Sequence, residues 1–198
     1  MSEDDIRNTA RHFRALAIAL AARDQYTGVH CGRTCALSAE LGAECALSAR
    51  EMVLLHTAAV MHDVGKMAIP DRVLLKPGRL DAAEWEEMKS HPACGEAILM
   101  ALQVDEMHVV AKVVRHHHEG YGGGGYPDQL AGEAIPVLSR IIALADSYDA
   151  MVTSRSYHPG RGHAEVMAIL AQECGAKYDP YLYGKFARVI EASVYRAR

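Results

Sequence analysis

The chain has 198 residues, of which 50% are hydrophobic, and a formal net charge of −4. This length suits one domain, 1–198. No stretch approaches the ~20 apolar residues that span a bilayer, and a chain without a basic excess is a poor partner for a nucleic acid polymer. Its five cysteines form no CxxC pair and suit reduced thiols better than a disulfide framework, so we expect a cytoplasmic protein that binds no membrane and no nucleic acid polymer.

Apolar residues recur at intervals of three and four along most of the chain, which predicts an all-α fold. The expected helices are 4–23, 28–42, 48–64, 81–102, 104–118, 136–153, 162–174 and 180–196. The first belongs to a lead segment, 1–27, that offers a surface for a homodimer, and the core occupies 28–198. Ser48 followed by Glu51 is typical of a capping box at the start of a helix.

The segment 119–136 is the long irregular stretch of the sequence. It holds Gly120, Gly122, Gly123, Gly124, Gly125 and Gly132, together with Pro127 and Pro136. Loops of this length inside a compact domain are usually lids or binding loops, and this one directly follows His117 and His118. We expect a long, exposed and mobile loop beside a functional site.

Two aspartates and five histidines give the strongest chemical signal. They are His30, His62, Asp63, His91, His117, His118 and Asp146, each placed where a helix face or a helix end is expected to turn inward. Buried imidazole and carboxylate groups need a partner or a metal ion, and two divalent cations would satisfy this set. Each residue alone has an ordinary alternative as a core histidine with a hydrogen-bond partner or as a surface residue. Asp149 competes with Asp146 for its inward position.

Several segments resemble one known family. They are HDVGKMAIP (62–70), HHE (117–119), GYP (125–127), IP (135–136) and DSYDAMVTSRSY (146–157). From His30 to Phe186 the chain resembles the HD-GYP subgroup of the HD phosphohydrolase superfamily. The resemblance implies an all-α HD-domain helical bundle with a glycine-rich GYP loop, and a cytoplasmic bacterial enzyme that hydrolyses cyclic di-GMP at a cluster of metal ions.

The resemblance implies a binuclear metal centre. The first metal would take His30, His62, Asp63 and Asp146, and the second would take Asp63, His91, His117 and His118, with Asp63 as the bridge. A glutamate that some members use for a third metal is replaced here by Tyr26, so two divalent ions are expected. Imidazole and carboxylate ligands suit iron, manganese, nickel or zinc, and the resemblance favours iron or manganese.

The resemblance also implies a mechanism. A hydroxide shared by the two metals would attack a phosphodiester phosphorus and open cyclic di-GMP to pGpG or, after a second cycle, to GMP. Asp63 and Lys66 are the expected catalytic residues, and Lys66, Arg155, Tyr126 and His158 are the expected substrate-binding residues. His158 replaces the family's usual lysine, which weakens a phosphate contact at neutral pH because imidazole is then mostly uncharged.

Departures in the loop leave alternatives open. Gly120 and Gly122 stand where the family usually carries an arginine and an aspartate. The alternatives are a catalytically weak cyclic di-GMP receptor, a module that docks on a diguanylate cyclase domain through the GYP loop, and a hydrolase of another cyclic dinucleotide. The retained aspartates and histidines favour a hydrolase, since a binding-only domain has little need of them.

Overall fold

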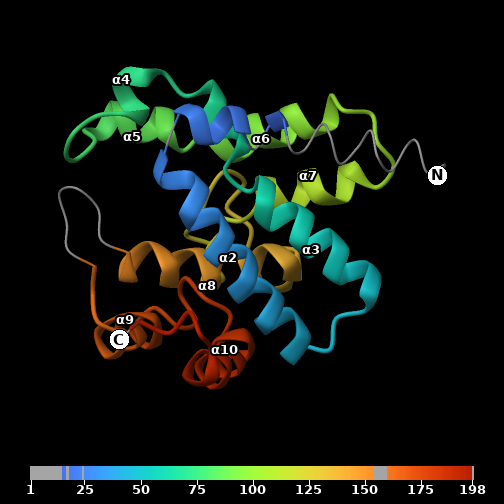
Figure 1. The fold of residues 1–198 in the computed structure, drawn as a ribbon, viewed down its shortest axis with the longest axis vertical. Coiled ribbons are helices and arrows are strands. Elements are labelled where there is room, and N and C mark those ends of the chain that lie inside the picture. Colours follow the sequence, from blue (N-terminus) through green and yellow to red (C-terminus); the bar gives the residue numbers. More distant parts are fainter. Residues whose placement is uncertain (1–14, 17, 24, 154–159, 198) are drawn as a thin grey trace.

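The computed structural model describes residues 15–16, 18–23, 25–153 and 160–197, and the regular elements in these ranges are helices (Figure 1). They are α2 (Gln25–Glu44), α3 (Ala49–Met61), η1 (Val64–Ala68), α4 (Asp71–Leu74), α5 (Ala82–Met88), α6 (His91–Met100), α7 (Met107–Arg115), η2 (Gly132–Ala134), α8 (Val137–Val152), α9 (His163–Gln172) and α10 (Pro180–Ala192). The predicted all-α fold is confirmed. Most of the expected lead helix lies outside the described residues, although 15–16 and 18–23 are helical.

The helices pack around one apolar core. α2 lies against both α3 and α8, α7 packs on α3 and α6, and α9 and α10 close the opposite end of the molecule (Figure 1). The largest fully buried side chains include Leu37, Leu41, Ile141, Tyr148 and Phe186. In this arrangement, the end of α3, the start of α6 and the end of α7 meet beside the first half of α2 and the second half of α8.

One expected helix, 81–102, is wrong, because the structure divides it into α5 and α6 at Lys89 and Ser90. Proline lacks an N–H and is tolerated only in the first turn of a helix, and Pro92 occupies the first turn of α6. Pro92 cannot donate a hydrogen bond to the carbonyl of Met88, so that oxygen is open to another donor. The expected helices 28–42, 48–64 and 104–118 appear with shifted ends as α2, α3 and α7.

The close packing of η1 on α6 depends on Gly65. A Cβ atom added there would lie 1.8 Å from the carbonyl oxygen of His91 and 2.5 Å from the backbone nitrogen of Gly95. Backbone atoms cannot swing aside as a flexible side chain can, so only glycine allows η1 to approach α6 this closely. This contact brings Asp63, two residues before Gly65, next to His91.

Gly65→Ala is expected to lower the free energy of unfolding by roughly 1–3 kcal/mol, as other overpacked positions do, and urea denaturation measures it. Gly184→Ala is the matched control. Gly184 lies within α10, and a Cβ added there would meet no atom within 4 Å. The same substitution should therefore raise stability by about 0.5–1 kcal/mol. Equal effects of the two variants would contradict the packing argument.

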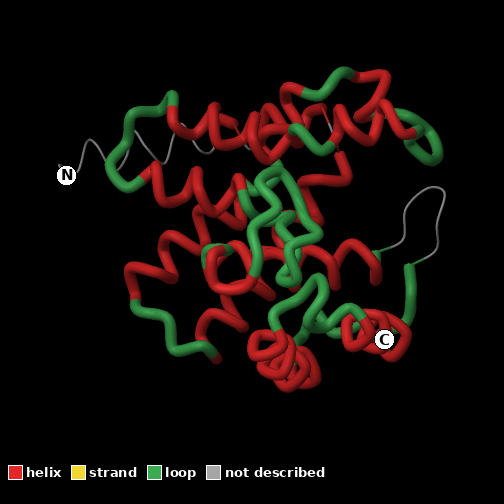
Figure 2. Tube along the Cα trace, turned by 180° about the vertical axis from the view of Figure 1, so that it is seen from behind, coloured by secondary structure: helices red, strands yellow, loops and turns green. Residues whose placement is uncertain are grey.

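The loop 119–136 runs through the middle of the molecule, between the group α4 to α7 and the pair α9 and α10 (Figures 1 and 2). Its first residues, Glu119 and Gly120, are buried. The N–H of Gly122 donates to the carbonyl of Ala176 at 2.7 Å, in the connection between α9 and α10. The expectation of an exposed loop is therefore wrong for its first part, because this connection covers it. The mobility of the loop stays a prediction.

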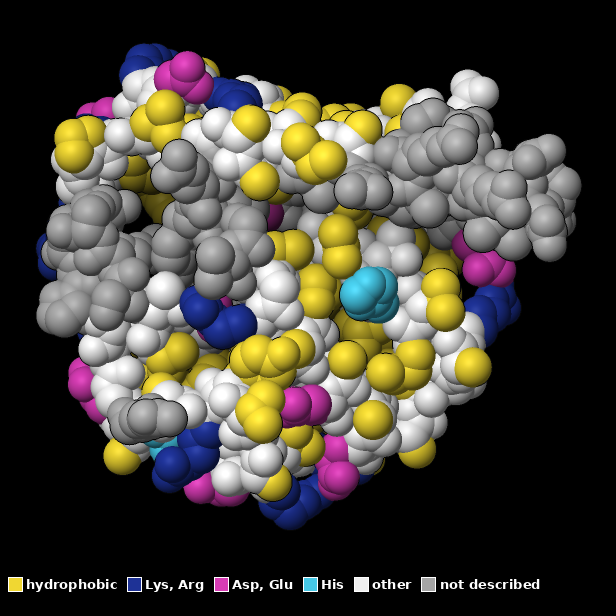
Figure 3. All heavy atoms as spheres, in the orientation of Figure 1, with side chains coloured by type: hydrophobic (Ala, Val, Ile, Leu, Met, Phe, Trp, Pro, Cys, Tyr) yellow, Lys and Arg dark blue, Asp and Glu magenta, His cyan; other side chains and the backbone are white. Residues whose placement is uncertain are grey.

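Apolar side chains are spread over much of the coloured part of the face shown in Figure 3. Lys and Arg side chains lie apart there, among acidic and apolar side chains, in the part drawn in colour. No helix within the described ranges combines the length and the apolar character that crossing a membrane requires.

Candidate metal centre

Three histidines reach the site from helix ends through the same backbone contact. His62 directly follows α3, His91 begins α6, and His117 lies two residues after the end of α7. Their Nδ1 atoms lie 2.7, 2.8 and 2.6 Å from the carbonyl oxygens of Ala59, Met88 and Val114. Carbonyls in the last turn of a helix lack an intrahelical donor. Because Nδ1–H donates to these oxygens, the Nε2 of each ring is the inward-facing nitrogen, the one that could bind a metal ion once it carries no proton.

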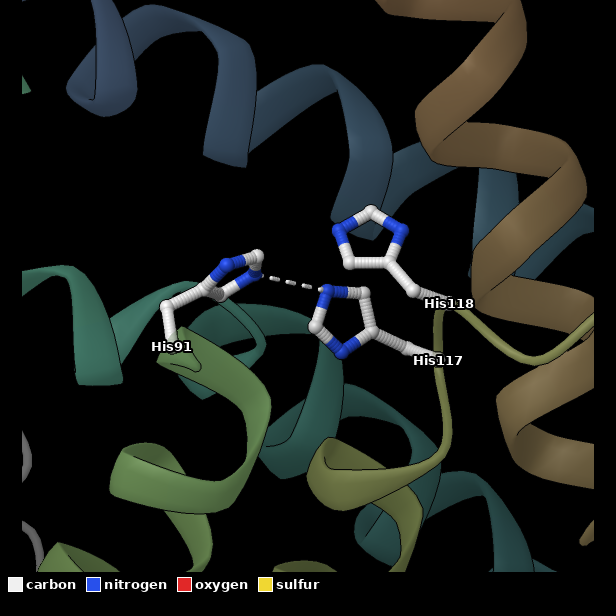
Figure 4. Close-up of side chains that lie close together, drawn as sticks. All are labelled: His91, His117 and His118. Atoms are coloured by element: carbon white, nitrogen blue, oxygen red, sulfur yellow. Dashed lines mark hydrogen bonds between the residues drawn. The ribbon is translucent and has the colours of Figure 1, made fainter. Parts of the chain in front are cut away.

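Figure 4 shows His91, His117 and His118 pointing toward one another from α6 and from the segment after α7. The Nε2 atoms of His91 and His117 lie 3.4 Å apart. The centroid of the His118 ring lies 5.0 Å from the centroid of the His91 ring and 4.0 Å from that of the His117 ring. Since Nδ1 holds the proton in His91 and His117, two lone pairs face each other, which is unfavourable unless a cation shares them.

A second group joins α2, the end of α3 and α8. The Nε2 of His30 lies 2.7 Å from Oδ1 of Asp146, and the same oxygen is 3.7 Å from Nε2 of His62. Within the described residues, the buried Nε2 of His62 makes no hydrogen bond. Behind His30, its Nδ1–H donates to Asp149 at 2.5 Å, and Arg33 binds the Asp149 carboxylate in turn. Asp149 thus contacts one ring nitrogen of His30 while Asp146 contacts the other, and this contact suits a role in orienting the ring.

Asp63 lies between the two groups. Its Oδ1 is 3.5 Å from Nε2 of His91, and its Oδ2 is 3.4 Å from Nε2 of His62. The side chain is almost fully buried. One carboxylate thus presents one oxygen to each group of histidines.

Protonation differs between the two groups when no metal is bound. Burial lowers the pKa of His117 to about 3 and that of His91 to about 4, so both imidazoles are neutral near pH 7. Burial alone would also lower the pKa values of His30 and His62. The carboxylates beside them outweigh that effect and raise the two pKa values to about 10 and about 9.

The donor set fits divalent cations. In each of two groups, His91 with His117 and His118, and His30 with His62 and Asp63, the candidate ligand atoms lie within 4.8 Å of one another. Imidazole nitrogen and carboxylate oxygen are the donors that iron, manganese and zinc accept. The unbonded Nε2 of His62 and the facing nitrogens of the other group are polar atoms that a cation would satisfy.

Metal binding is expected to release protons from His30 and His62. Both carry an extra proton at neutral pH in metal-free protein, because their pKa values are about 10 and about 9, and a ligand nitrogen must lose its proton. The apparent affinity for Mn²⁺ should rise about tenfold per pH unit for each displaced proton between about pH 6 and 8. Calorimetry of chelator-treated protein in buffers of different ionisation enthalpy measures the release. An affinity independent of pH would contradict these protonation states.

Lys66 places a cation at the edge of the centre. Its Nζ lies 2.7 Å from Oδ2 of Asp63, and its side chain is partly exposed. Burial alone would raise the pKa of Asp63, but the charges of Lys66 and His62 hold it well below its usual value. Lys66 also faces a cavity of about 1040 Å³, which is lined by His30, Asp63, His91, His117, His118, Tyr126 and Asp146 as well.

Of the expected substrate-binding residues, Lys66 and Tyr126 lie in the described part of the chain. Tyr126 lies in the cavity with its ring tilted by 33° over that of His118, at a centroid distance of 5.0 Å. Arg155 and His158 fall outside the described part of the chain, as does the side chain of Tyr26.

Glu119 and Asp128 fix the loop to the end of α7. The Glu119 carboxylate accepts hydrogen bonds from the backbone N–H groups of Asp128 at 2.7 Å and Leu130 at 3.1 Å. The Asp128 carboxylate is bound by Arg115 at 2.7 Å and by Nε2 of His116 at 2.8 Å. These contacts hold the loop against the adjacent histidine pair. Sequence reasoning missed them, because their partners lie nine or more residues apart within an irregular segment.

Comparison with known proteins connects this geometry to a family. A family model described as HD domain matches residues 10–182. A cyclic di-GMP phosphodiesterase of Vibrio cholerae is 39% identical over 197 residues, which cover 96% of this chain and 36% of that protein. The cyclic di-GMP phosphodiesterase response regulator RpfG of Xanthomonas campestris is 40% identical over 165 residues, covering 83% and 44%. A 3′3′-cGAMP-specific phosphodiesterase of Vibrio cholerae is 37% identical over 179 residues, covering 90% and 34%. The chain spans less than half the length of these relatives.

Solved structures show the same fold. An HDGYP protein of Bdellovibrio bacteriovorus superposes with a TM-score of 0.68 at 20% identity, covering 82% of this chain and 52% of that one. The HD domain of the Listeria monocytogenes phosphodiesterase PgpH, in complex with cyclic di-AMP, superposes with a TM-score of 0.62 at 14% identity, covering 88% and 93%. The predicted HD-domain helical bundle is confirmed. From the matching family model and these relatives, the chain belongs to the HD domain family.

Proposed function

We propose that this chain is a metal-dependent phosphodiesterase that hydrolyses cyclic di-GMP to pGpG, GMP or both. The observation that carries the proposal is the position of Asp63, whose two oxygens face two separate groups of histidines at 3.4 and 3.5 Å. A carboxylate shared in this way is suited to bridge two metal ions a few ångströms apart. Two relatives named as cyclic di-GMP phosphodiesterases support the same activity.

Two divalent ions would occupy the centre, with iron or manganese favoured and nickel or zinc also compatible with the donor set. Asp63 would be shared, and the remaining ligands would be His30, His62 and Asp146 on one side and His91, His117 and His118 on the other. When bound, two such ions would supply an activated water and neutralise the charge on phosphodiester oxygens.

Asp63 and Lys66 are the proposed catalytic residues. Asp63 holds the two halves of the centre together. Lys66 lies 2.7 Å from that carboxylate, so its ammonium can contact a phosphodiester bound beside Asp63 and donate a proton to the leaving 3′-oxygen as the P–O3′ bond breaks. Tyr126 offers a further contact inside the cavity, and Arg155 and His158 are proposed to bind the phosphates.

The cavity suits a substrate of this size. Its volume of about 1040 Å³ is slightly larger than the usual range for small-molecule sites. The relatives named for 3′3′-cGAMP make that hybrid dinucleotide the second candidate substrate. Docking of a diguanylate cyclase domain on the loop 119–136, a homodimer through the lead segment and a cytoplasmic location are further proposals from the sequence.

Product analysis by anion-exchange chromatography tests the proposal. Protein loaded anaerobically with Fe²⁺ or Mn²⁺ is incubated with cyclic di-GMP, 3′3′-cGAMP and pGpG in separate reactions. Formation of pGpG or GMP from cyclic di-GMP is the expected result. Turnover of 3′3′-cGAMP alone would identify that hybrid dinucleotide as the substrate. Tight binding without turnover in both metal forms would identify a receptor.

A further inference from the structure

Aromatic side chains line part of the cavity beside the metal centre, and one of them, Trp85, keeps much of its surface accessible. Trp85, in α5, lines this cavity and is 46% exposed. Its ring meets that of Tyr126 edge to face, with a centroid distance of 6.3 Å and an interplanar angle of 81°. Tyr126 in turn lies against His118 at 5.0 Å. The ring of Tyr126 thus packs against His118 on the side of the metal centre, whereas Trp85 keeps much of its surface accessible inside the cavity.

A structural role in the core does not account for Trp85. No residue of α5 is buried, so this helix contributes nothing to the apolar interior. Polar contacts hold it in place instead: a capping box joins Asp81 and Glu84, and Arg72 of α4 binds Glu87 at 2.7 Å. A large aromatic side chain held on a polar helix and directed into a cavity is typical of a ligand contact.

We propose that Trp85 stacks on one purine base of the cyclic dinucleotide, a role that rests on the proposed function. The rings of His118, Tyr126 and Trp85 form a series from the centre outward, so a substrate with its phosphate at the centre would extend a base along these rings. Every nucleobase has a π face, and stacking on an aromatic side chain depends little on which base it is. Trp85 therefore supplies affinity for purine dinucleotides in general and does not select guanine over adenine.

The fluorescence of Trp85 gives a direct readout, because the chain has a single tryptophan. Cyclic di-GMP is mixed with metal-loaded protein in a stopped-flow instrument, and emission is recorded before turnover. Stacking predicts saturable quenching by cyclic di-GMP and no saturable change with ribose 5-phosphate, which carries a phosphate but no base.

Variants add a kinetic readout. Trp85→Ala should raise the KM for cyclic di-GMP roughly 5- to 150-fold, the range found for loss of one stacked base, with kcat and metal content close to those of the wild type. Trp85→Phe should recover part of the loss. Tyr181→Ala is the matched control, because Tyr181 is an aromatic residue of α10, 68% exposed, that does not line the cavity.

The outcomes separate this inference from the proposed function. Hydrolysis without quenching, or an unchanged KM in Trp85→Ala, overturns stacking and leaves the phosphodiesterase in place. Quenching without hydrolysis supports stacking and contradicts the proposed phosphodiesterase activity. The absence of both overturns both.

Discussion

Asp63→Ala is expected to lower the turnover of cyclic di-GMP by at least about 10³-fold, which corresponds to about 4 kcal/mol of transition-state stabilisation. The physical reason is that one carboxylate serves both groups of histidines, with an oxygen 3.4 Å from His62 and another 3.5 Å from His91. In the proposed centre, its removal would take a ligand from both ions at once. The measurement pairs initial rates with metal content by mass spectrometry, and we expect about one metal or none per chain.

Folding has to be separated from chemistry in this experiment. Removing a buried carboxylate leaves Lys66 without the partner at 2.7 Å, so circular dichroism and urea denaturation accompany the assay. Asp63→Asn keeps the shape while removing the charge, and it should lose activity in the same way. Asp105→Ala is the control, since Asp105 is an exposed aspartate in the connection before α7. Full activity with two metals in Asp63→Asn would contradict the bridging role.

Lys66→Met is expected to separate catalysis from metal binding. Turnover should fall by about 10²-fold or more, the usual effect of losing a positioned proton donor. Metal affinity should stay the same or increase, because the ammonium of Lys66 competes with a metal for the charge of Asp63. The methionine keeps the apolar stem of the side chain, so packing changes little.

The control for this variant is Lys112→Met, which removes an exposed lysine from α7. Rates are measured with saturating cyclic di-GMP, and metal affinity is measured by competition with a chelator. A parallel fall of metal content and turnover in Lys66→Met would show that Lys66 supports the centre and not the chemical step. Unchanged turnover would remove Lys66 from the catalytic residues.

Much of the helical frame was predictable because the apolar positions repeat with the period of a helix. The ends of α3 and α7 were expected at residues 64 and 118 but lie at Met61 and Arg115, so His62 and His117 follow these helices. The gathering of seven histidines and aspartates was predicted by their joint presence, since an apolar core does not bury so many ionisable groups singly. The roles of these residues as metal ligands stay predictions.

The break between α5 and α6 could have been recognised from sequence, because Pro92 lacks an N–H and belongs in the first turn of a helix that begins at His91. Other features depend on contacts between distant residues. Asp149 could not be assigned from sequence, because its partners His30 and Arg33 lie more than a hundred residues earlier. Trp85 could not be recognised from sequence as a cavity residue, because a helical period does not show which side chain lines a cavity.

Anomalous diffraction from crystals of the manganese-loaded protein tests the central claim most directly. Two peaks are predicted, one on each side of the Asp63 carboxylate, with His30, His62 and Asp146 around the first and His91, His117 and His118 around the second. A single peak, or peaks that do not share Asp63, would contradict the binuclear centre on which the proposed function is based.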